Sequence, residues 1–127
     1  MTALCTPVRG TVHAEPAAGP ATLLSLEVSA DEPVFRGHYP AFPIFPGVCL
    51  VEFVRLGALA AHAGPDRAWR MAEVRTARFT DPVRPGDHLT AALAWQREAD
   101  AWLCRATVST RRGVAAKVTL VLEEVAT

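Results

Sequence analysis

The segment at residues 46–62 constrains the fold more than any other part of this chain. It is apolar on nearly every side, and only Glu52 and Arg55 interrupt it with charge. A Pro-Gly pair is a favourable helix start, and Gly64-Pro65 ends the pattern. The spacing predicts one helix, about 24 Å long at ~1.5 Å per residue. A helix with so little polar surface must be covered on most sides, so it needs a sheet to lie against.

After this helix the apolar period changes to two, which is typical of half-buried strands. The predicted strands are residues 22–29 before the helix and 69–79, 89–96, 102–110 and 114–123 after it. Turn signals join the last four strands, at residues 81–87, 97–100 and 111–113. A short strand at residues 8–14 is possible, and the rest of the 1–20 segment is expected to be irregular. The pattern predicts an α+β protein in which a curved antiparallel sheet wraps around one long central helix. Residues 1–127 are expected to form a single domain.

Composition excludes several classes of function. The chain has thirteen basic and thirteen acidic residues, which argues against nucleic-acid binding, where a basic surface is expected. No apolar run reaches the ~18 residues of a membrane span, and the N-terminus does not resemble a signal peptide. Three widely spaced cysteines favour a reduced compartment, and the four histidines show no metal-ligand spacing. We therefore expect a cytoplasmic protein without a metal site and without membrane contact.

One histidine and one carboxylate stand out as candidate acid and base. His38 lies in a proline-rich stretch without period, and Glu52 follows fourteen residues later in the apolar helix. Burying an ionisable group is costly, which makes a carboxyl in such a helix a candidate for chemistry. Histidine titrates near neutral pH and suits proton transfer. The pair therefore predicts acid–base catalysis.

The residues around this pair carry two motifs. Residues 35–40 read Phe-Arg-Gly-His-Tyr-Pro, and residues 43–48 read Pro-Ile-Phe-Pro-Gly-Val. Together with Glu52 they resemble the 3-hydroxyacyl-[acyl-carrier-protein] dehydratases of the FabZ and FabA type, which have the hotdog fold. The stretch 77–89 also matches, so the resemblance covers roughly residues 22–123.

The resemblance implies a reaction and a role for each residue. A dehydratase of this type removes water from a (3R)-hydroxyacyl thioester to give a trans-2-enoyl thioester, in fatty acid or polyketide and polyene biosynthesis. His38 would be the base that takes the C2 proton, and Glu52 the acid at the C3 hydroxyl, because an apolar environment raises a carboxyl pKa. The backbone N–H of Gly47, at a helix N-terminus, would stabilise negative charge on the thioester carbonyl.

The resemblance also implies partners. The active site would lie at a dimer interface, within a homodimer or a heterodimer with a second hotdog subunit. The substrate would be carried on the phosphopantetheine of an acyl carrier protein, and no metal or redox cofactor is needed. The acyl chain would contact Phe42, Phe45, Pro46 and Val48. Because carrier proteins are acidic, the candidate docking residues are Arg36, Arg78, Arg84, Arg111 and Arg112.

Two departures from the family pattern leave alternatives open. Leu56 stands where the dehydratases usually have Gln, and Arg55 is spaced to form an ion pair with Glu52, which would lower the pKa of the carboxyl. One alternative is a hotdog acyl thioesterase, in which the helix carboxylate activates water and His38 is not needed. The other is a non-catalytic subunit of a heteromeric dehydratase.

Overall fold

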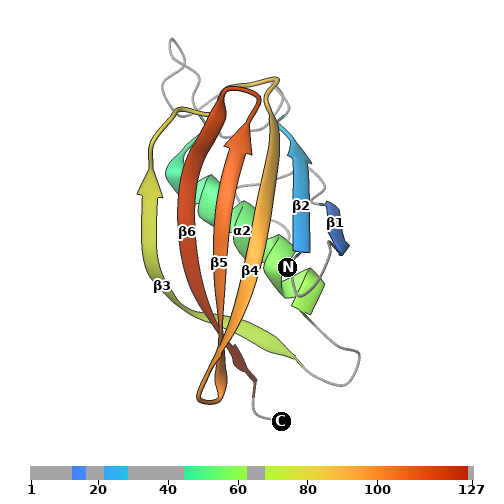
Figure 1. Ribbon diagram of the computed structural model, residues 1–127, viewed down its shortest axis with the longest axis vertical. Coiled ribbons are helices and arrows are strands. Elements are labelled where there is room, and N and C mark those ends of the chain that lie inside the picture. The colour runs from blue at the N-terminus through green and yellow to red at the C-terminus, as the bar shows by residue number, and fades with distance from the viewer. Residues whose placement is uncertain (1–12, 17–21, 29–44, 63–67, 126–127) are drawn as a thin grey trace, which may run out of the picture.

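The structure is a computed structural model that describes residues 13–16, 22–28, 45–62 and 68–125. These residues form one helix and six strands (Figure 1). Their bounds are β1 His13–Pro16, β2 Thr22–Glu27, α2 Gly47–His62, β3 Trp69–Phe79, β4 His88–Glu98, β5 Ala101–Thr110 and β6 Gly113–Glu124.

All six strands form one antiparallel sheet in the order β1-β2-β4-β5-β6-β3. The two strands that flank α2 in the chain, β2 and β3, are therefore separated by three other strands. This separation arises because α2 runs across one face of the sheet and carries the chain from one side to the other (Figure 1). β1 and β3 are the edge strands, and β3 is exposed along nearly its whole length.

The core lies between the concave face of the sheet and one side of α2. Alternate residues of each central strand point into it, as in β2, where Leu24 and Leu26 are buried while Leu23 and Glu27 are exposed. The helix residues that pack against the sheet are Cys49, Leu50, Phe53, Val54 and Ala58. The opposite side of α2, which we call the open side, is less covered: Glu52 and Leu59 are of intermediate exposure, and Val48 is 66% exposed. Of residues 47–61 only Val48, Ala60 and Ala61 are exposed, so the expectation that the helix is buried on most sides is confirmed.

The predicted central helix and wrapped sheet are confirmed. The bounds of α2 and β3 agree with the prediction, and β4, β5 and β6 begin or end one or two residues beyond the predicted ranges. The N-terminal prediction needs a correction. The possible strand was predicted to end at residue 14, but strand β1 spans His13–Pro16. β1 is held by backbone pairing to β2, and Pro16 is tolerated because β1 is an edge strand.

The turn predicted at residues 97–100 is tighter than expected. Arg97 and Glu98 stay paired with Trp102 and Ala101, so only Ala99 and Asp100 form the loop. Ala99 has φ 53°, a left-handed conformation that is unfavourable for alanine. A two-residue hairpin loop commonly requires such a φ.

Candidate active site

The start of α2 is fixed by two sets of backbone hydrogen bonds. The Phe45 N–H donates to the Val83 carbonyl oxygen at 2.6 Å, and both side chains are buried. The Pro46 carbonyl oxygen then accepts from the amides of Cys49 at 2.9 Å and Leu50 at 3.2 Å. The second of these bonds has the i to i−4 pattern of an α-helix. The first residue of α2, Gly47, is thereby held at one end of the core.

Gly47 lies against the ring of Phe79, the last residue of β3. A Cβ placed on Gly47 would be 2.9 Å from Phe79 Cζ and 3.0 Å from Cε2, well inside the normal separation of two carbon atoms. A larger residue at position 47 would have to displace the ring, which is 48% exposed. The close approach therefore favours glycine at this position.

The first amides of α2 are suited to an anion. The first four N–H groups of a helix have no acceptor within the helix, and the structure gives the Gly47 and Val48 N–H groups no acceptor among the described residues. The positive end of the helix dipole lies at the same place. These amides can therefore stabilise negative charge that develops on a carbonyl oxygen.

Glu52 lies in the second turn of α2 and forms a two-point ion pair with Arg55. Arg55 Nε donates to Glu52 Oε1 at 2.6 Å, and Arg55 Nη2 donates to Oε2 at 3.0 Å. The Glu52 side chain is 11% exposed and that of Arg55 is 33% exposed. The Glu52 carboxylate raises the pKa of the Arg55 guanidinium, partly offset by burial. The ion pair expected from the spacing is confirmed.

Glu52 and Arg55 lie on the side of α2 that faces away from the protein's own sheet. Their neighbours Phe53 and Val54 face the sheet and are buried, and helical geometry sends positions 52 and 55 to the other side. Val48, one turn before Glu52, shares this open side. The carboxylate is thus close to the helix start but outside the core of this chain.

Several predicted site residues lie outside the described residues: His38, Phe42 and Arg36. The pairing of His38 with Glu52 therefore stays a prediction. Of the remaining predicted acyl contacts, Phe45 is buried in the core, Pro46 is half-buried, and Val48 is exposed beside Gly47.

The sequence analysis missed Phe79 as a site residue. Phe79 pairs with the buried Ala116 of β6 and so lies on the concave face of the sheet, as does Val74, which pairs with Leu120. Both are partly exposed, at 48% and 40%. Phe79 and Val48 therefore both expose apolar surface beside Gly47. A two-residue period would place Val74 and Phe79, five residues apart, on opposite faces, and the irregularity between Val74 and Thr76 brings them to one face. The sequence shows neither this irregularity nor that the strand is at an edge.

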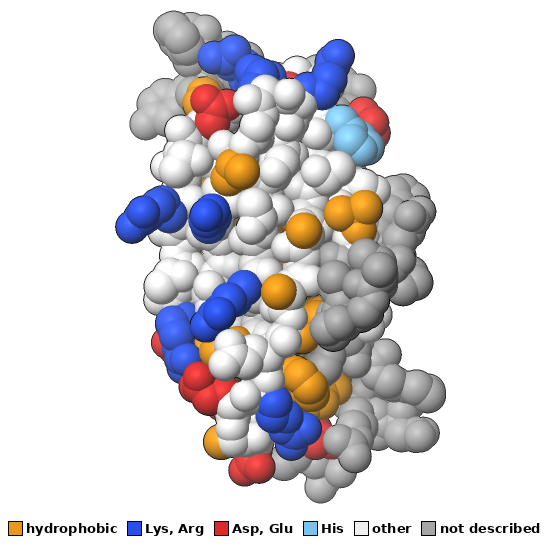
Figure 2. All heavy atoms as spheres, viewed as in Figure 1, with side chains coloured by type: hydrophobic (Ala, Val, Ile, Leu, Met, Phe, Trp, Pro, Cys, Tyr) orange, Lys and Arg blue, Asp and Glu red, His pale blue; other side chains and the backbone are white. Residues whose placement is uncertain are grey.

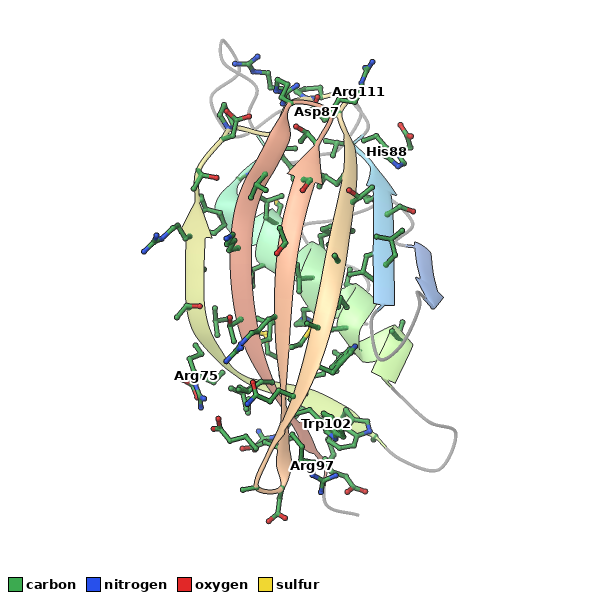
Figure 3. All side chains as sticks on the ribbon, in the orientation of Figure 1. Arg75, Asp87, His88, Arg97, Trp102 and Arg111 are labelled. Carbon is green, nitrogen blue, oxygen red and sulfur yellow. The ribbon has the colours of Figure 1, made fainter. Side chains whose placement is uncertain are left out.

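The predicted docking arginines fall in two places. Arg84, Arg111 and Arg112 lie at one end of the sheet, because Arg84 and Arg112 both bond to Asp87, and Figure 3 labels Arg111 and Asp87 at its upper end. The guanidinium of Arg112 already has partners within the chain, since it forms ion pairs with Asp87 at 2.7 Å and with Asp81 at 3.5 Å. The first of these pairs, with a hydrogen bond from the Arg84 N–H, holds the pKa of Asp87 below its ordinary value.

Arg78 lies instead on the outer face of β3, directly opposite Lys117 of β6. A shallow hollow there is lined by these two residues with Thr76, Ala77 and Thr119. Figure 2 shows this outer face, where Lys and Arg side chains gather along one edge and at the upper end. Like charges that face each other across strands destabilise a sheet, so a negatively charged partner would relieve the repulsion between Arg78 and Lys117.

The described residues contain no group of three or more metal-ligating side chains close enough to hold an ion. Cys49 and Cys104 are both buried and form no disulfide with a described residue, and burial raises the pKa of Cys104 to about 12. Within the same residues, α2 is too short to cross a membrane.

A six-stranded antiparallel sheet around one central helix is the hotdog fold, and solved hotdog proteins share it. The dehydratase heterocomplex ApeI:P from Xenorhabdus doucetiae aligns with 91% of this chain and 98% of that chain, at TM-score 0.71 and 22% identity. A mutant of the thioesterase PA1618 from Pseudomonas aeruginosa aligns with 90% of this chain and 81% of that chain, at TM-score 0.71 and 17% identity. At these identities the likeness shows the fold alone.

The family is shown by sequence. A family model described as ApeI-like, ApeI dehydratase, matches residues 15–117, and the chain belongs to this family. The 3-hydroxyacyl-[acyl-carrier-protein] dehydratase FabZ of Pelotomaculum thermopropionicum is 39% identical over 92 residues, which cover 69% of this chain and 61% of that protein. Across three such curated relatives, the chain spans 41% to 61% of their length.

Proposed function

We propose that the chain is a dehydratase that removes water from (3R)-hydroxyacyl thioesters of acyl carrier protein and forms trans-2-enoyl thioesters. The observation that carries the proposal is the family match over residues 15–117. It is supported by the position of Glu52 near the start of α2, beside amides that can hold a charged carbonyl oxygen.

The reaction divides between three groups. The thioester carbonyl oxygen accepts hydrogen bonds from the amide of Gly47, which makes the C2 proton more acidic. His38 takes that proton. Glu52 acts as the acid at the C3 hydroxyl. The C3–O bond then breaks, the double bond forms and water leaves. The reaction needs no metal or redox cofactor.

We infer that a second hotdog subunit, identical or different, completes the site. The open side of α2 carries Glu52 and the exposed Val48, and the adjacent edge strand β3 exposes Val74 and Phe79. The exposed apolar side chains of Phe79 and Val48 beside Gly47 favour an interaction site, and an edge strand offers unpaired backbone groups to another chain. The heterocomplex among the structural relatives supports a partner of the same fold.

The carrier protein is proposed to dock on Arg78 and Lys117, with Arg84 and Arg111 as a second basic point. Arg78 follows Ala77 and precedes Phe79, so it lies within one residue of the side chain that touches Gly47. A basic surface so close to the entrance would bind an acidic carrier and steer its arm towards α2. The cytoplasmic location expected from the sequence stays a prediction.

Mass spectrometry tests the activity directly. The purified chain is incubated with 3-hydroxyacyl carrier proteins of several chain lengths, and loss of water from the acyl group is followed. Glu52→Gln and His38→Ala should each abolish conversion, whereas Glu123→Gln, which removes an exposed carboxylate paired with Arg70, should not. Conversion that survives both active-site changes would refute the proposal.

Thioesterase activity is the second candidate, because hotdog thioesterases are among the structural relatives. The same incubation with acyl carrier protein or acyl-CoA separates the two. Release of free acid that persists in His38→Ala, without any enoyl product from the unaltered chain, favours hydrolysis.

A non-catalytic role in a heteromeric dehydratase is the third candidate, favoured by the Glu52–Arg55 ion pair. In that case the chain alone gives no product, and an added hotdog partner restores conversion. If Glu52→Gln then leaves the restored activity unchanged, this chain does not supply the reacting carboxyl.

A further inference from the structure

The connection between β3 and β4, residues 80–87, lies against the start of α2. The Phe45 N–H donates to the Val83 carbonyl oxygen at 2.6 Å, and both side chains are buried. The same connection bonds to the residue after β2, because the Val28 N–H donates to the Asp87 carbonyl oxygen at 2.9 Å. The first turn of α2 comes directly after Phe45, so its place depends on where this connection is held.

Arg112, in the turn between β5 and β6, binds this connection at several oxygens. Its Nη1 and Nη2 donate to Asp87 Oδ1 at 3.1 Å and to Oδ2 at 2.7 Å. Nη2 also donates to the Pro82 carbonyl oxygen at 3.1 Å, and Asp81 Oδ2 lies 3.5 Å from Nε. Figure 1 shows this turn and the β3–β4 connection at the upper end of the sheet. One guanidinium, whose donors have a fixed geometry, thus joins the beginning and the end of the connection.

Arg112 binds the peptide unit next to the one that Phe45 uses. The Pro82 carbonyl oxygen belongs to the peptide that links Pro82 to Val83, and the next carbonyl, that of Val83, accepts from Phe45. Because a peptide unit is planar, fixing its oxygen also orients the backbone of Val83. Proline has no N–H and cannot anchor this stretch through its own amide. The path of hydrogen bonds from Arg112 to the residue before Pro46 is therefore short.

The contact between Arg112 and Asp87 is more shielded than an ordinary surface ion pair. The Asp87 side chain is 14% exposed, whereas that of Glu123, the partner of Arg70, is 44% exposed. Water screens exposed ion pairs, which then contribute little. Two parallel, charge-assisted bonds to one carboxylate are stronger and also fix a direction. The geometry therefore suits a residue that holds a loop in place.

We propose that Arg112 is a positioning residue for the thioester. It holds residues 82–87, and through Val83 and Phe45 it fixes the place of the Gly47 amide at the start of α2. The proposal rests on the proposed dehydratase function, in which that amide donates to the substrate's carbonyl oxygen. Arg112 itself does not touch the substrate, and this role differs from the carrier docking expected from the sequence. Position matters here, since a displacement of about 1 Å can lower a rate by about 100-fold.

Steady-state kinetics with a 3-hydroxyacyl carrier protein separate positioning from docking. Arg112→Leu should lower kcat by about 10- to 100-fold. KM should stay unchanged, because the amide acts mainly on charge that develops in the transition state. Arg70→Leu removes an exposed ion pair and should change neither constant. A higher KM with unchanged kcat in Arg112→Leu would make Arg112 a docking residue and overturn the proposal.

Arg112→Lys tests whether the two-point geometry matters in a chain that keeps the charge. A lysine ammonium can pair with Asp87 but lacks the planar fork of arginine. We expect this variant to fold, as followed by thermal unfolding, and to have a kcat below that of the unaltered chain. It also decides the question if Arg112→Leu does not fold. An unaltered kcat in Arg112→Lys would show that the fork is not needed and would refute the proposal.

Amide hydrogen exchange, followed by NMR, gives a readout that does not depend on activity. In Arg112→Leu the Phe45 amide should exchange faster by about tenfold or more, the size expected when a hydrogen bond to a charged group is lost. The Val54 amide, in the middle of α2, should exchange as in the unaltered chain. Arg111→Leu, which removes the same charge from the same turn, should leave both amides unchanged.

The exchange results separate the inference from the proposed function. Equal acceleration of the Phe45 and Val54 amides in Arg112→Leu would mean general destabilisation and would overturn the inference, as would unchanged exchange at Phe45. Faster exchange at Phe45 alone, in a protein whose unaltered chain does not dehydrate any substrate, would confirm that Arg112 holds the start of α2 and refute only the dehydratase function.

Discussion

Gly57 is a point of very close approach between α2 and the sheet. A Cβ added there would lie 2.3 Å from Leu24 Cδ1, 2.5 Å from Cδ2 and 2.9 Å from Cγ. Carbon atoms pack at about 3.5–4.0 Å, so the Leu24 side chain would have to move by more than 1 Å. Leu24 has no exposed surface, so there is no solvent-filled space to receive it. We therefore expect Gly57→Ala to force a shift of the helix or of β2.

Two opposing contributions set the size of the effect. Replacing glycine by alanine within a helix favours folding by about 1 kcal/mol, while overpacking a core typically costs about 1–3 kcal/mol and sometimes more. Three atoms within 3 Å place this site at the upper end of that range. We expect the free energy of unfolding to fall by about 1–3 kcal/mol in total.

Urea unfolding followed by circular dichroism, at one fixed protein concentration, measures the loss. Ala60→Gly, at an exposed position of the same helix, measures only the difference in helix propensity between alanine and glycine. It should lower the free energy of unfolding by about 1 kcal/mol. Leu24→Ala alone should cost about 2–5 kcal/mol. In the double variant the new methyl group fills part of the space left by Leu24. The loss of unfolding free energy in the double variant should therefore be smaller than the sum of the two single losses by more than ~0.5 kcal/mol. Losses that add within that margin, or a Gly57→Ala chain more stable than the original, would show that the close approach is not a constraint.

Three further predictions concern single sites. Because Arg112 lowers the pKa of Asp87, this carboxylate stabilises the fold above its unfolded-state pKa and ceases to do so as pH falls through the folded value. Asp87→Asn should therefore cost about 1 kcal/mol near neutral pH, and the difference from the original chain in urea unfolding should shrink below about pH 4. In a chain that also carries Cys5→Ser, Cys104 should resist thiol reagents at about pH 8 until the chain unfolds, because burial raises the pKa of its thiol to about 12. Rapid labelling of Cys104 in the folded chain would contradict this. Ala99→Asn, which tolerates the left-handed conformation at φ 53°, should raise the free energy of unfolding by about 0.5–1 kcal/mol, and an unchanged midpoint in urea would count against strain at that turn.

Local signals explain why much of the fold could be predicted from the sequence. The helix bounds follow from residues adjacent to the helix ends, where proline and glycine act through their own backbone conformation. The strand β3 follows from the alternation within residues 69–79. The Glu52–Arg55 pair follows from a spacing of three on a helix.

The contacts that complete the candidate site could not be predicted in this way, because they join distant parts of the chain. Phe79 touches Gly47 only because α2 crosses the sheet and places β3 at the edge opposite β1. What covers the side of α2 that faces away from the sheet could not be predicted for a related reason. An apolar helix surface shows that something must cover it, but it does not show whether that cover comes from the same chain or from another one.

The same topology is the reason to expect that one chain provides only part of the proposed site. The sheet covers the side of α2 that carries Phe53 and Val54, so the carboxylate of Glu52 must face outwards on the opposite side. The positive end of the helix lies beside the edge strand β3, whose exposed Phe79 and Val74 border the opening. A partner that adds to this edge would cover Val48 and enclose Glu52 with the Gly47 amide, and excluding water strengthens the electrostatic stabilisation on which the proposed reaction depends. Closure of the site and assembly of the oligomer are therefore expected to be the same event, and dehydratase activity per chain should fall on dilution below the dissociation constant of the assembly.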